Sequence, residues 1–191
     1  MDSLAIAERD KYRRMWAEPS YRHASPGESL VSDFLEAVPW KPGDTLIDLG
    51  CGTGRAGLSL HRAGLDVTLL DLWNGALDPD PKINLPFIEG LLWNIPVVGA
   101  KWSWFFCTDV MEHIPTEKVD AVLDNIARIT TKGGYMQIAL CPDSCGQYIG
   151  ETLHLTLKPE NWWTEKLIKH WKVERLDTRS SHLIYVLGGK L

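Results

Sequence analysis

The feature that most constrains this chain is a glycine-rich turn at 48–54, with the sequence Asp-Leu-Gly-Cys-Gly-Thr-Gly. It follows the apolar run 45–47 and precedes an alternating apolar segment that ends at Gly64. This order predicts a strand, a tight turn and a helix. Glycine at every second position lets the backbone approach a ligand closely, because glycine has no Cβ and tolerates positive φ. The N-terminus of the following helix directs free N–H groups at the same place. The turn is therefore typical of a site for a nucleotide-like cofactor.

Two classes of cofactor site use such a turn, and the acid before the glycines separates them. Gly52, Gly54 and Gly57 match the dinucleotide fingerprint, with Asp71 placed as the acid that binds a ribose. Asp48, however, precedes the first glycine by two residues. Its carboxylate would repel a pyrophosphate and attract an ammonium group. The residues thus favour a cofactor with a cationic amino-acid tail over NAD, and a turn of purely structural use is the third alternative.

The string DLGCGTGR at 48–55 resembles motif I of the class I S-adenosylmethionine (SAM)-dependent methyltransferases. The resemblance continues through Asp71 and the segment CTDVMEHIP at 107–115. It implies SAM as the cofactor and S-adenosylhomocysteine (SAH) as its product. It also implies that Asp48 lies near the amino-acid end of SAM, while the glycines pass beneath the adenosine.

The same resemblance implies the fold. We expect an α/β, Rossmann-like three-layer sandwich whose seven-stranded, mostly parallel sheet has the order 3-2-1-4-5-7-6 and an antiparallel last strand. We expect one methyltransferase domain over 1–191. In it, residues 1–38 form helices that cover part of the cofactor and substrate, and 45–187 form the Rossmann-like core.

Composition narrows the class of protein. The chain has 191 residues, 45% hydrophobic and 24% charged, which is ordinary for a soluble globular protein. Its net charge of −5 gives no electrostatic footprint for nucleic acid. No signal peptide or apolar run of membrane length is present, so we expect a cytoplasmic protein without a membrane partner. Cys141, Cys145 and His154 lack the fourth ligand and the spacing of a zinc site, and we expect no metal.

Hydrophobic patterning predicts the elements of this fold. The segment 74–84 contains two prolines and is too broken for a long helix. Ser25 to Glu28 match a capping box that opens a helix ending before Pro39. We expect Gly133 and Gly134 to close the helix before them. Strands are predicted at 45–49, 67–70, 85–89, 102–107, 135–140, 171–177 and 182–187, and helices at 3–17, 54–63, 116–131 and 161–170.

Several cofactor contacts follow from the resemblance. Asp71 ends the second strand, where a carboxylate accepts hydrogen bonds from both ribose hydroxyls. Leu72 covers the adenine, and Trp93 either stacks on the adenine or belongs to the core. Related enzymes often carry an acid after Gly90, but this chain has Leu91 and Leu92 there, so that contact does not carry over. The full set of predicted cofactor residues is Arg22, Asp48, Gly50, Cys51, Gly52, Gly54, Asp71, Leu72, Leu92, Trp93 and Cys107.

Two further segments bear on the acceptor. Asp109 and His113 follow the fourth strand, which the resemblance places beside the sulfonium, and they are the candidate catalytic residues. The alternative role for His113 is structural: its side chain holds the loop to the helix that follows. The helix at 3–17 interleaves cationic residues with Tyr12 and Trp16, which indicates a solvated face or a lid over the cofactor.

The function predicted from these features is methyl transfer from SAM to a small or medium-sized acceptor, at oxygen or nitrogen rather than carbon or sulfur. One alternative is a non-catalytic SAM-binding subunit of a methyltransferase complex. The other is a small NAD-dependent reductase, for which the chain shows no Tyr-x-x-x-Lys pair.

Overall fold

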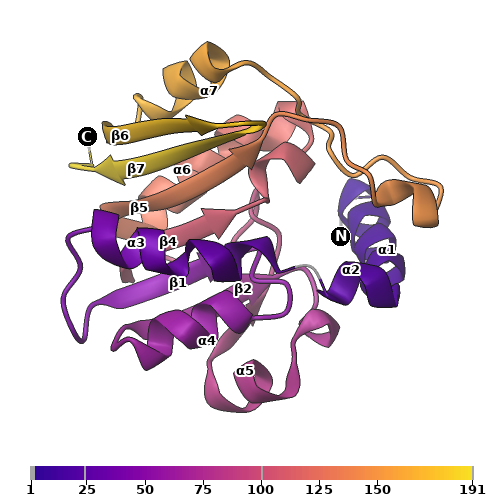
Figure 1. Ribbon diagram of the computed structural model, residues 1–191, viewed down its shortest axis with the longest axis horizontal. Helices are drawn as coiled ribbons and strands as arrows, with labels where there is room; N and C mark the ends of the chain where they lie inside the picture. Colours follow the sequence, from indigo (N-terminus) through magenta and orange to yellow (C-terminus); the bar gives the residue numbers. More distant parts are fainter. Residues whose placement is uncertain (1–2, 24, 100, 191) are drawn as a thin grey trace.

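A single twisted sheet organises the chain. The structure, a computed structural model, describes residues 3–23, 25–99 and 101–190 (Figure 1). The sheet has seven strands in the order β3-β2-β1-β4-β5-β7-β6. The strands from β3 to β5 are parallel, and β7 is antiparallel to both of its neighbours. The predicted fold class and strand order are confirmed. The strands are β1 (Thr45–Leu49), β2 (Asp66–Asp71), β3 (Phe87–Glu89), β4 (Trp102–Thr108), β5 (Thr130–Ala139), β6 (Lys172–Arg179) and β7 (His182–Gly188).

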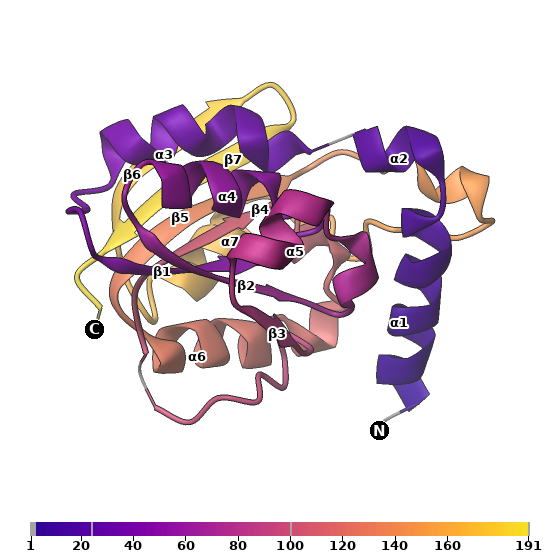
Figure 2. The ribbon, with the colours of Figure 1, turned by 90° about the horizontal axis from the view of Figure 1, so that it is seen from below.

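Helices cover both faces of the sheet, and a further helix crosses its edge. Figure 2 shows α3 and α4 on one face, α6 on the other, and α1 standing across the end of the strands. Among the described residues, no helix is both long and apolar enough to cross a membrane. The α-helices are α1 (Ser3–Trp16), α2 (Pro19–His23), α3 (Val31–Ala37), α4 (Arg55–Arg62), α5 (Pro79–Asn84), α6 (Val119–Ile129) and α7 (Glu160–Leu167). Short 3₁₀ turns are η1 (Pro26–Leu30), η2 (Asn74–Ala76), η3 (Met111–His113), η4 (Thr116–Lys118) and η5 (Gly146–Tyr148).

The core consists of two hydrophobic clusters, one on each face of the sheet. Along β4, Phe105 belongs to the cluster with α6 and α7, and Phe106 to the cluster with α3 and α4. Along β5, Met136 belongs to the cluster with α6 and α7, and Tyr135 to the cluster with α3 and α4. Strands buried on both faces must be apolar at successive positions, which explains the continuous apolar runs in the sequence.

Two local predictions were wrong, at Gly133–Gly134 and at Ser25. The helix ends at Ile129, and both glycines lie inside β5. A Cβ on Gly133 would lie 2.0 Å from the carbonyl oxygen of Leu187, so the pair serves close strand packing rather than helix termination. Ser25 precedes a 3₁₀ turn and makes no side-chain cap, so the capping box does not form.

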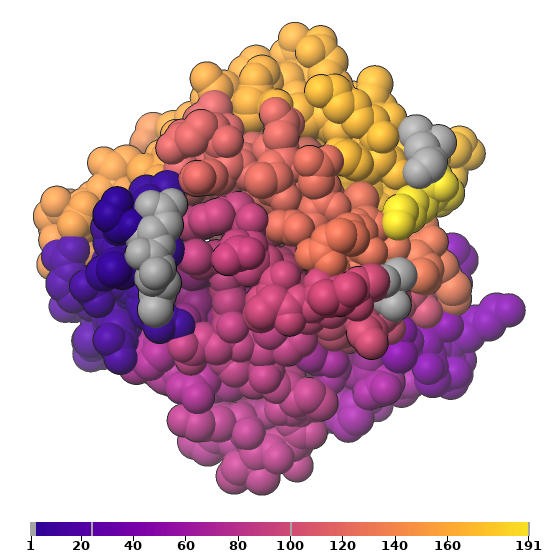
Figure 3. Space-filling model, turned by 180° about the vertical axis from the view of Figure 1, so that it is seen from behind, coloured from indigo at the N-terminus to yellow at the C-terminus, as the bar shows by residue number. Residues whose placement is uncertain are grey.

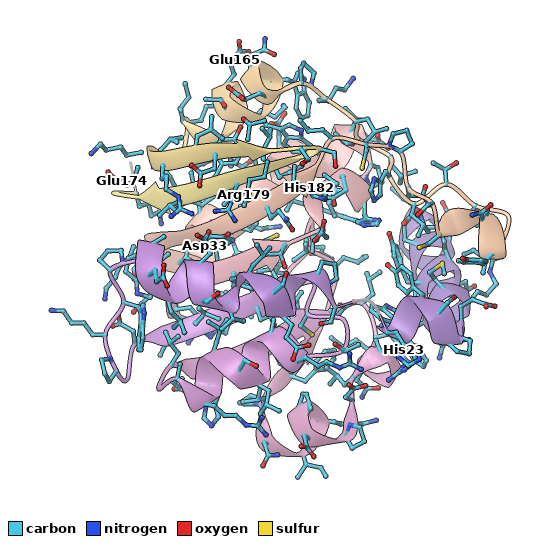
Figure 4. All side chains as sticks on the ribbon, viewed as in Figure 1. His23, Asp33, Glu165, Glu174, Arg179 and His182 are labelled. Carbon is cyan, nitrogen blue, oxygen red and sulfur yellow. The ribbon has the colours of Figure 1, made fainter. Side chains whose placement is uncertain are left out.

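An ion-pair cluster ties α3 to the far edge of the sheet. Asp33 accepts hydrogen bonds from Tyr135 and Arg175 at 2.6 Å each, and Arg179 lies 3.3 Å from its other oxygen. Figure 4 shows Asp33 and Arg179 facing one another. Burial raises the pKa of Asp33, but these hydrogen bonds and charges outweigh it and hold the pKa below its usual value.

Asp33→Asn should lower the free energy of unfolding at pH 7 by about 1 kcal/mol, because it removes charge-assisted hydrogen bonds. A carboxyl with a depressed folded-state pKa stabilises the protein above its unfolded pKa of about 3.9, and this stabilisation disappears as the pH falls through the folded value. Urea unfolding at pH 7 and pH 3 measures the effect, with the exposed Asp80→Asn as the control. An equal loss at both pH values would contradict the ion-pair account.

Candidate functional site

The glycine turn after β1 has the backbone that the sequence predicts. Gly50 and Gly52 have φ values of +70° and +51°, which few side chains tolerate. A Cβ on Gly50 would meet Val110 at 2.5 Å, and one on Gly52 would meet the Trp16 ring at 2.8 Å. The turn is therefore pressed between the loop after β4 and the N-terminal helix, and no other residue type fits there.

Two adjoining cavities lie at the carboxyl edge of the sheet, with volumes of about 630 Å³ and about 1010 Å³. The first lies against the ends of β2 and β3, and the second against the turn after β1 and the 141–158 connection. Both are open spaces next to α1. The residues that line both cavities are Trp16, Tyr21, Gly50, Asp109 and His113.

Asp71 provides the acid of the first cavity. Its carboxylate accepts hydrogen bonds from the N–H groups of Gly52 at 2.8 Å and Leu72 at 2.6 Å. Burial raises the pKa of Asp71 to about 6, although the two hydrogen bonds act in the opposite direction. Leu72, Leu92 and Trp93 add apolar surface to this cavity. Trp93 also packs against the core on the α6 side, so the two roles considered for it coexist.

Asp48 provides the acid of the second cavity, beside Cys51 and Gly52. It is only 4% exposed, and its Oδ2 atom has no hydrogen-bond partner among the described residues. Burial, reinforced by the charge of Asp71, raises the pKa of Asp48 to about 7. A buried carboxylate without a partner is costly, and a ligand cation would remove that cost.

Three predicted cofactor residues do not line either cavity. Cys107 lies in the core on the α6 side, because alternation along β4 turns it away from the sheet edge. Gly54 is the N-cap residue of α4. The Arg22 guanidinium lies 3.0 Å from the Asp78 carboxylate and 3.3 Å from the carbonyl oxygen of Gly75, so it ties α2 to the segment before α5.

The loop after β4 brings two acids under the cavities. Asp109 has a φ of +53°, and its Oδ1 lies 3.6 Å from Nε2 of His182. Burial raises the pKa of Asp109, although His182 and His154 act against this. Glu112 is fully buried, and burial raises its pKa well above the usual value. Sequence reasoning did not select Glu112, because nothing in its local pattern distinguishes it from an exposed helix residue.

His113 is enclosed by aromatic and imidazole groups. Its Nδ1 lies 2.7 Å from the hydroxyl of Tyr12, and its ring is perpendicular to that of His154, with centroids 4.7 Å apart. Burial, aided by the charges of His154 and Lys11, lowers the pKa of His113 to about 3. The imidazole is therefore neutral near pH 7. The contact between His113 and Tyr12 was not predicted from the sequence. The only hint was the presence of Tyr12 and Trp16 among the cationic residues of the first helix.

The N-terminal helix is fastened at both ends of the site. Arg9 donates to the carbonyl oxygen of Leu72 and pairs with Glu89 at the end of β3. Arg14 pairs with Glu151 of the 141–158 connection. Figure 3 shows the indigo atoms of α1 beside the magenta segment after β2 and β3. The helix thus covers the cavities and borders them with Tyr12 and Trp16.

The comparisons with known proteins agree with this geometry. The sequence model of a family described as a methyltransferase domain matches residues 46–134. The chloroplastic magnesium protoporphyrin IX methyltransferase of Arabidopsis thaliana is 26% identical over 134 residues, which cover 65% of this chain and 42% of that protein. The chain spans about half of the length of the curated relatives it matches. In an uncharacterized methyltransferase of Synechocystis, for example, the match covers 48% of that protein.

Solved structures share the fold over nearly the whole chain. A protein of Pyrococcus horikoshii OT3 has a TM-score of 0.71 at 12% identity, covering 91% of this chain and 92% of its own. The magnesium protoporphyrin IX methyltransferase of Synechocystis PCC 6803, with bound SAH, has a TM-score of 0.65 at 21% identity, with 92% and 91% covered. The family match and the shared fold support the predicted resemblance to the class I SAM-dependent methyltransferase family.

Asp48→Asn should stabilise the ligand-free protein at pH 8 by on the order of 1 kcal/mol, because it removes a buried, unpartnered charge. With a folded-state pKa of about 7, the folded protein holds more protons than the unfolded chain between about pH 4 and pH 7. The free energy of unfolding of the wild type therefore contains a contribution that falls as the pH rises through this window, and the variant lacks it.

Denaturant unfolding of both proteins between pH 4 and pH 8 measures this difference, with the exposed Asp66→Asn as the control. Parallel stability curves for wild type and Asp48→Asn would show that Asp48 carries no buried charge.

Proposed function

We propose that this protein transfers the methyl group of SAM to the oxygen or nitrogen of a small or medium-sized acceptor. The observation that carries the proposal is the pair of acids, the buried Asp48 and the half-buried Asp71, which lie beside the glycine turn and line adjoining cavities. Relatives named as an O-methyltransferase and as an N-methyltransferase support these two kinds of acceptor atom. The residue roles that follow belong to the same proposal.

The residues of this chain fit SAM. Asp71 accepts hydrogen bonds from the ribose hydroxyls, and Leu72, Leu92 and Trp93 cover the adenine. The unpartnered Oδ2 of Asp48 accepts from the amino group. Gly50, Cys51 and Gly52 form the turn beneath the nucleoside. The family resemblance offers Arg22 as the residue that holds the SAM carboxylate, and this contact requires Arg22 to leave Asp78.

When bound, SAM supplies a methyl group on a sulfonium, which is already a strong electrophile. The protein then acts mainly by placing the acceptor in line with that methyl group and by excluding water. Asp109 and His113 line both cavities, which puts them at the passage from cofactor to acceptor. Each offers a hydrogen-bonding group to the acceptor there, and Tyr12 fixes the orientation of the His113 ring.

The part of the second cavity that faces the 141–158 connection is the place for the acceptor, beyond the end that Asp48 and the glycine turn give to SAM. The cavity extends from the glycine turn to the 141–158 connection and is closed on one side by α1 and α2. The residues that line the two cavities include no lysine or arginine. This absence argues against a polyanionic acceptor such as nucleic acid, whose phosphates bind cationic side chains. The N-terminal helices act as the lid of the same single domain.

The first test is ligand binding. SAM and SAH, each at 100 times its Kd, should raise the stability by about 2.7 kcal/mol, and NAD should have no effect. Thermal shift with the three ligands measures this. No shift with SAM or SAH in folded protein would overturn the proposal. Transfer from methyl-labelled SAM to a panel of phenols, carboxylic acids, amines and thiols then separates an enzyme from a silent SAM-binding subunit.

Asp71→Ala should weaken SAH binding by about 1.5–3 kcal/mol, the value of hydrogen bonds to a charged group. It should also lower stability, because the N–H groups of Gly52 and Leu72 lose their acceptor. Calorimetric titration with SAH measures the affinity, and Asp66→Ala at the opposite end of β2 is the matched control. Equal SAH affinity in wild type and folded Asp71→Ala would place the ribose elsewhere.

A further inference from the structure

We propose that the loop after β4 and the 141–158 connection form a binding site for a divalent ion of the zinc class, with Glu112, His113 and His154 as its ligands. The site lies at the wall of the second cavity, to which His113 and His154 contribute surface. Binding of this ion does not depend on SAM, so its test is separate from that of methyl transfer. In the metal-bound form His113 is a ligand, and the acceptor contact proposed above is left to Asp109.

The first observation is the proximity of three good ligands. One ligand atom from each of Glu112, His113 and His154 lies within 4.8 Å of the other two. Ligand atoms of a tetrahedral zinc ion lie roughly 3.3 Å apart, given metal–nitrogen bonds of about 2.0 Å. Small side-chain rotations therefore bring the three groups onto one ion. Glu112 and His113 come from η3, whereas His154 comes from a connection about 40 residues later.

The second, independent observation is the state of Glu112. Its side chain is fully buried, and neither carboxylate oxygen has a hydrogen-bond partner among the described residues. A buried carboxylate needs a counter-charge or a hydrogen-bond donor, since the cost of leaving it unpaired is several kcal/mol by order of magnitude. Lys11 of α1, whose charge acts on His113, is already paired with Glu8 at 2.6 Å. A metal ion between Glu112 and the two imidazoles satisfies this carboxylate.

The histidines are oriented as metal ligands usually are. His154 Nδ1 lies 2.6 Å from the carbonyl oxygen of Cys141. A carbonyl only accepts, so Nδ1 carries the proton and Nε2 keeps its lone pair. His113 Nδ1 lies 2.7 Å from the Tyr12 hydroxyl, whose oxygen accepts in the metal-bound form. An ion at Nε2 then replaces the hydrogen bond of the ring to the Leu153 backbone. Carbonyl or hydroxyl support of the second ring nitrogen is common around bound metals.

The donor set selects the ion. Two imidazoles and one carboxylate suit zinc and its first-row neighbours, whereas magnesium and calcium prefer oxygen ligands throughout. Three protein ligands leave one position of a tetrahedral ion open, and two of the three, His113 and His154, line the second cavity. The cysteines that the sequence offered as ligands are outside the set, and Cys141 contributes only its carbonyl oxygen.

The test uses the full chain after treatment with a chelator, without SAM. Zinc should bind with one ion per chain and raise the melting temperature, cobalt(II) should give the visible absorption of a tetrahedral complex, and magnesium should do neither. His154→Asn and Glu112→Gln should each lower zinc affinity at least 100-fold. Tyr12→Phe, which removes only the support of His113, should lower it about 10-fold. His170→Gln, near α7, is the matched control and should keep wild-type affinity.

Circular dichroism and SAH affinity of each metal-free variant report whether it is folded. If the buried Glu112→Gln fails to fold, the partly buried His154→Asn decides. Absence of zinc binding by the wild type would overturn the site. So would wild-type zinc affinity in folded His154→Asn, or a magnesium effect equal to that of zinc. A variant that loses zinc binding but keeps wild-type SAH affinity would support the metal site and leave the proposed function untouched. A metal-free wild type that does not bind SAH would count against the proposed function and leave the metal site untouched.

Discussion

The parallel pairing of β1 with β2 and β4 is the constraint on which the site depends. In this register Asp48 lies beside Leu69 and Phe106, near the carboxyl ends of all three strands. Parallel strands leave on the same edge of a sheet, so every loop that follows them meets its neighbours there. The glycine turn, Asp71 and the loop with Asp109 become neighbours for this reason, although Asp109 follows Gly54 by 55 residues.

That convergence has an electrostatic cost. Asp48, Asp71 and Asp109 all have raised pKa values, with burial as the first cause in each case. The protein reduces the cost locally by directing backbone N–H groups at Asp71. Among the described residues, Asp48 and Asp109 each keep a buried oxygen without a hydrogen-bond partner, a feature that is concentrated at functional sites. Because these carboxylates are costly to ionise in the empty site, a cationic ligand that pairs with them is bound more tightly.

The N-terminal helix connects the two parts of this edge. It is held by Arg9 at the end of β3 and by Arg14 at the 141–158 connection, so it spans the cavities as a strap. Tyr12 on the same helix contacts His113, and Trp16 packs against the turn at Gly52. Any motion that admits a ligand beneath α1 therefore also changes the surroundings of His113. The hydrogen bond and the ring contact between Tyr12 and His113 connect the position of α1 with the histidine cluster.

The sequence alone determined the elements and the cofactor turn, because these depend on local patterns. Apolar runs marked strands buried on both faces, and the glycines of 50–54 marked a backbone with positive φ. The strand order came from the family resemblance that these residues carry. Hydrophobic periodicity marks where strands lie but does not say which strands are neighbours in the sheet. Asp48 and Asp71 were selected as candidates because each lies near the carboxyl end of its strand.

Only the tertiary structure decided which side chains meet. Gly133 packs against β7, and Cys107 turns to the core, because strand pairing and alternation act over distances that no local pattern encodes. Arg22 pairs with Asp78, some 56 residues away, since both lie beside the segment before α5. The contact of Tyr12 with His113 and the burial of Glu112 likewise arise from packing of a distant helix and loop. Local propensity fixes where a residue sits in its element, and long-range packing fixes what its side chain touches.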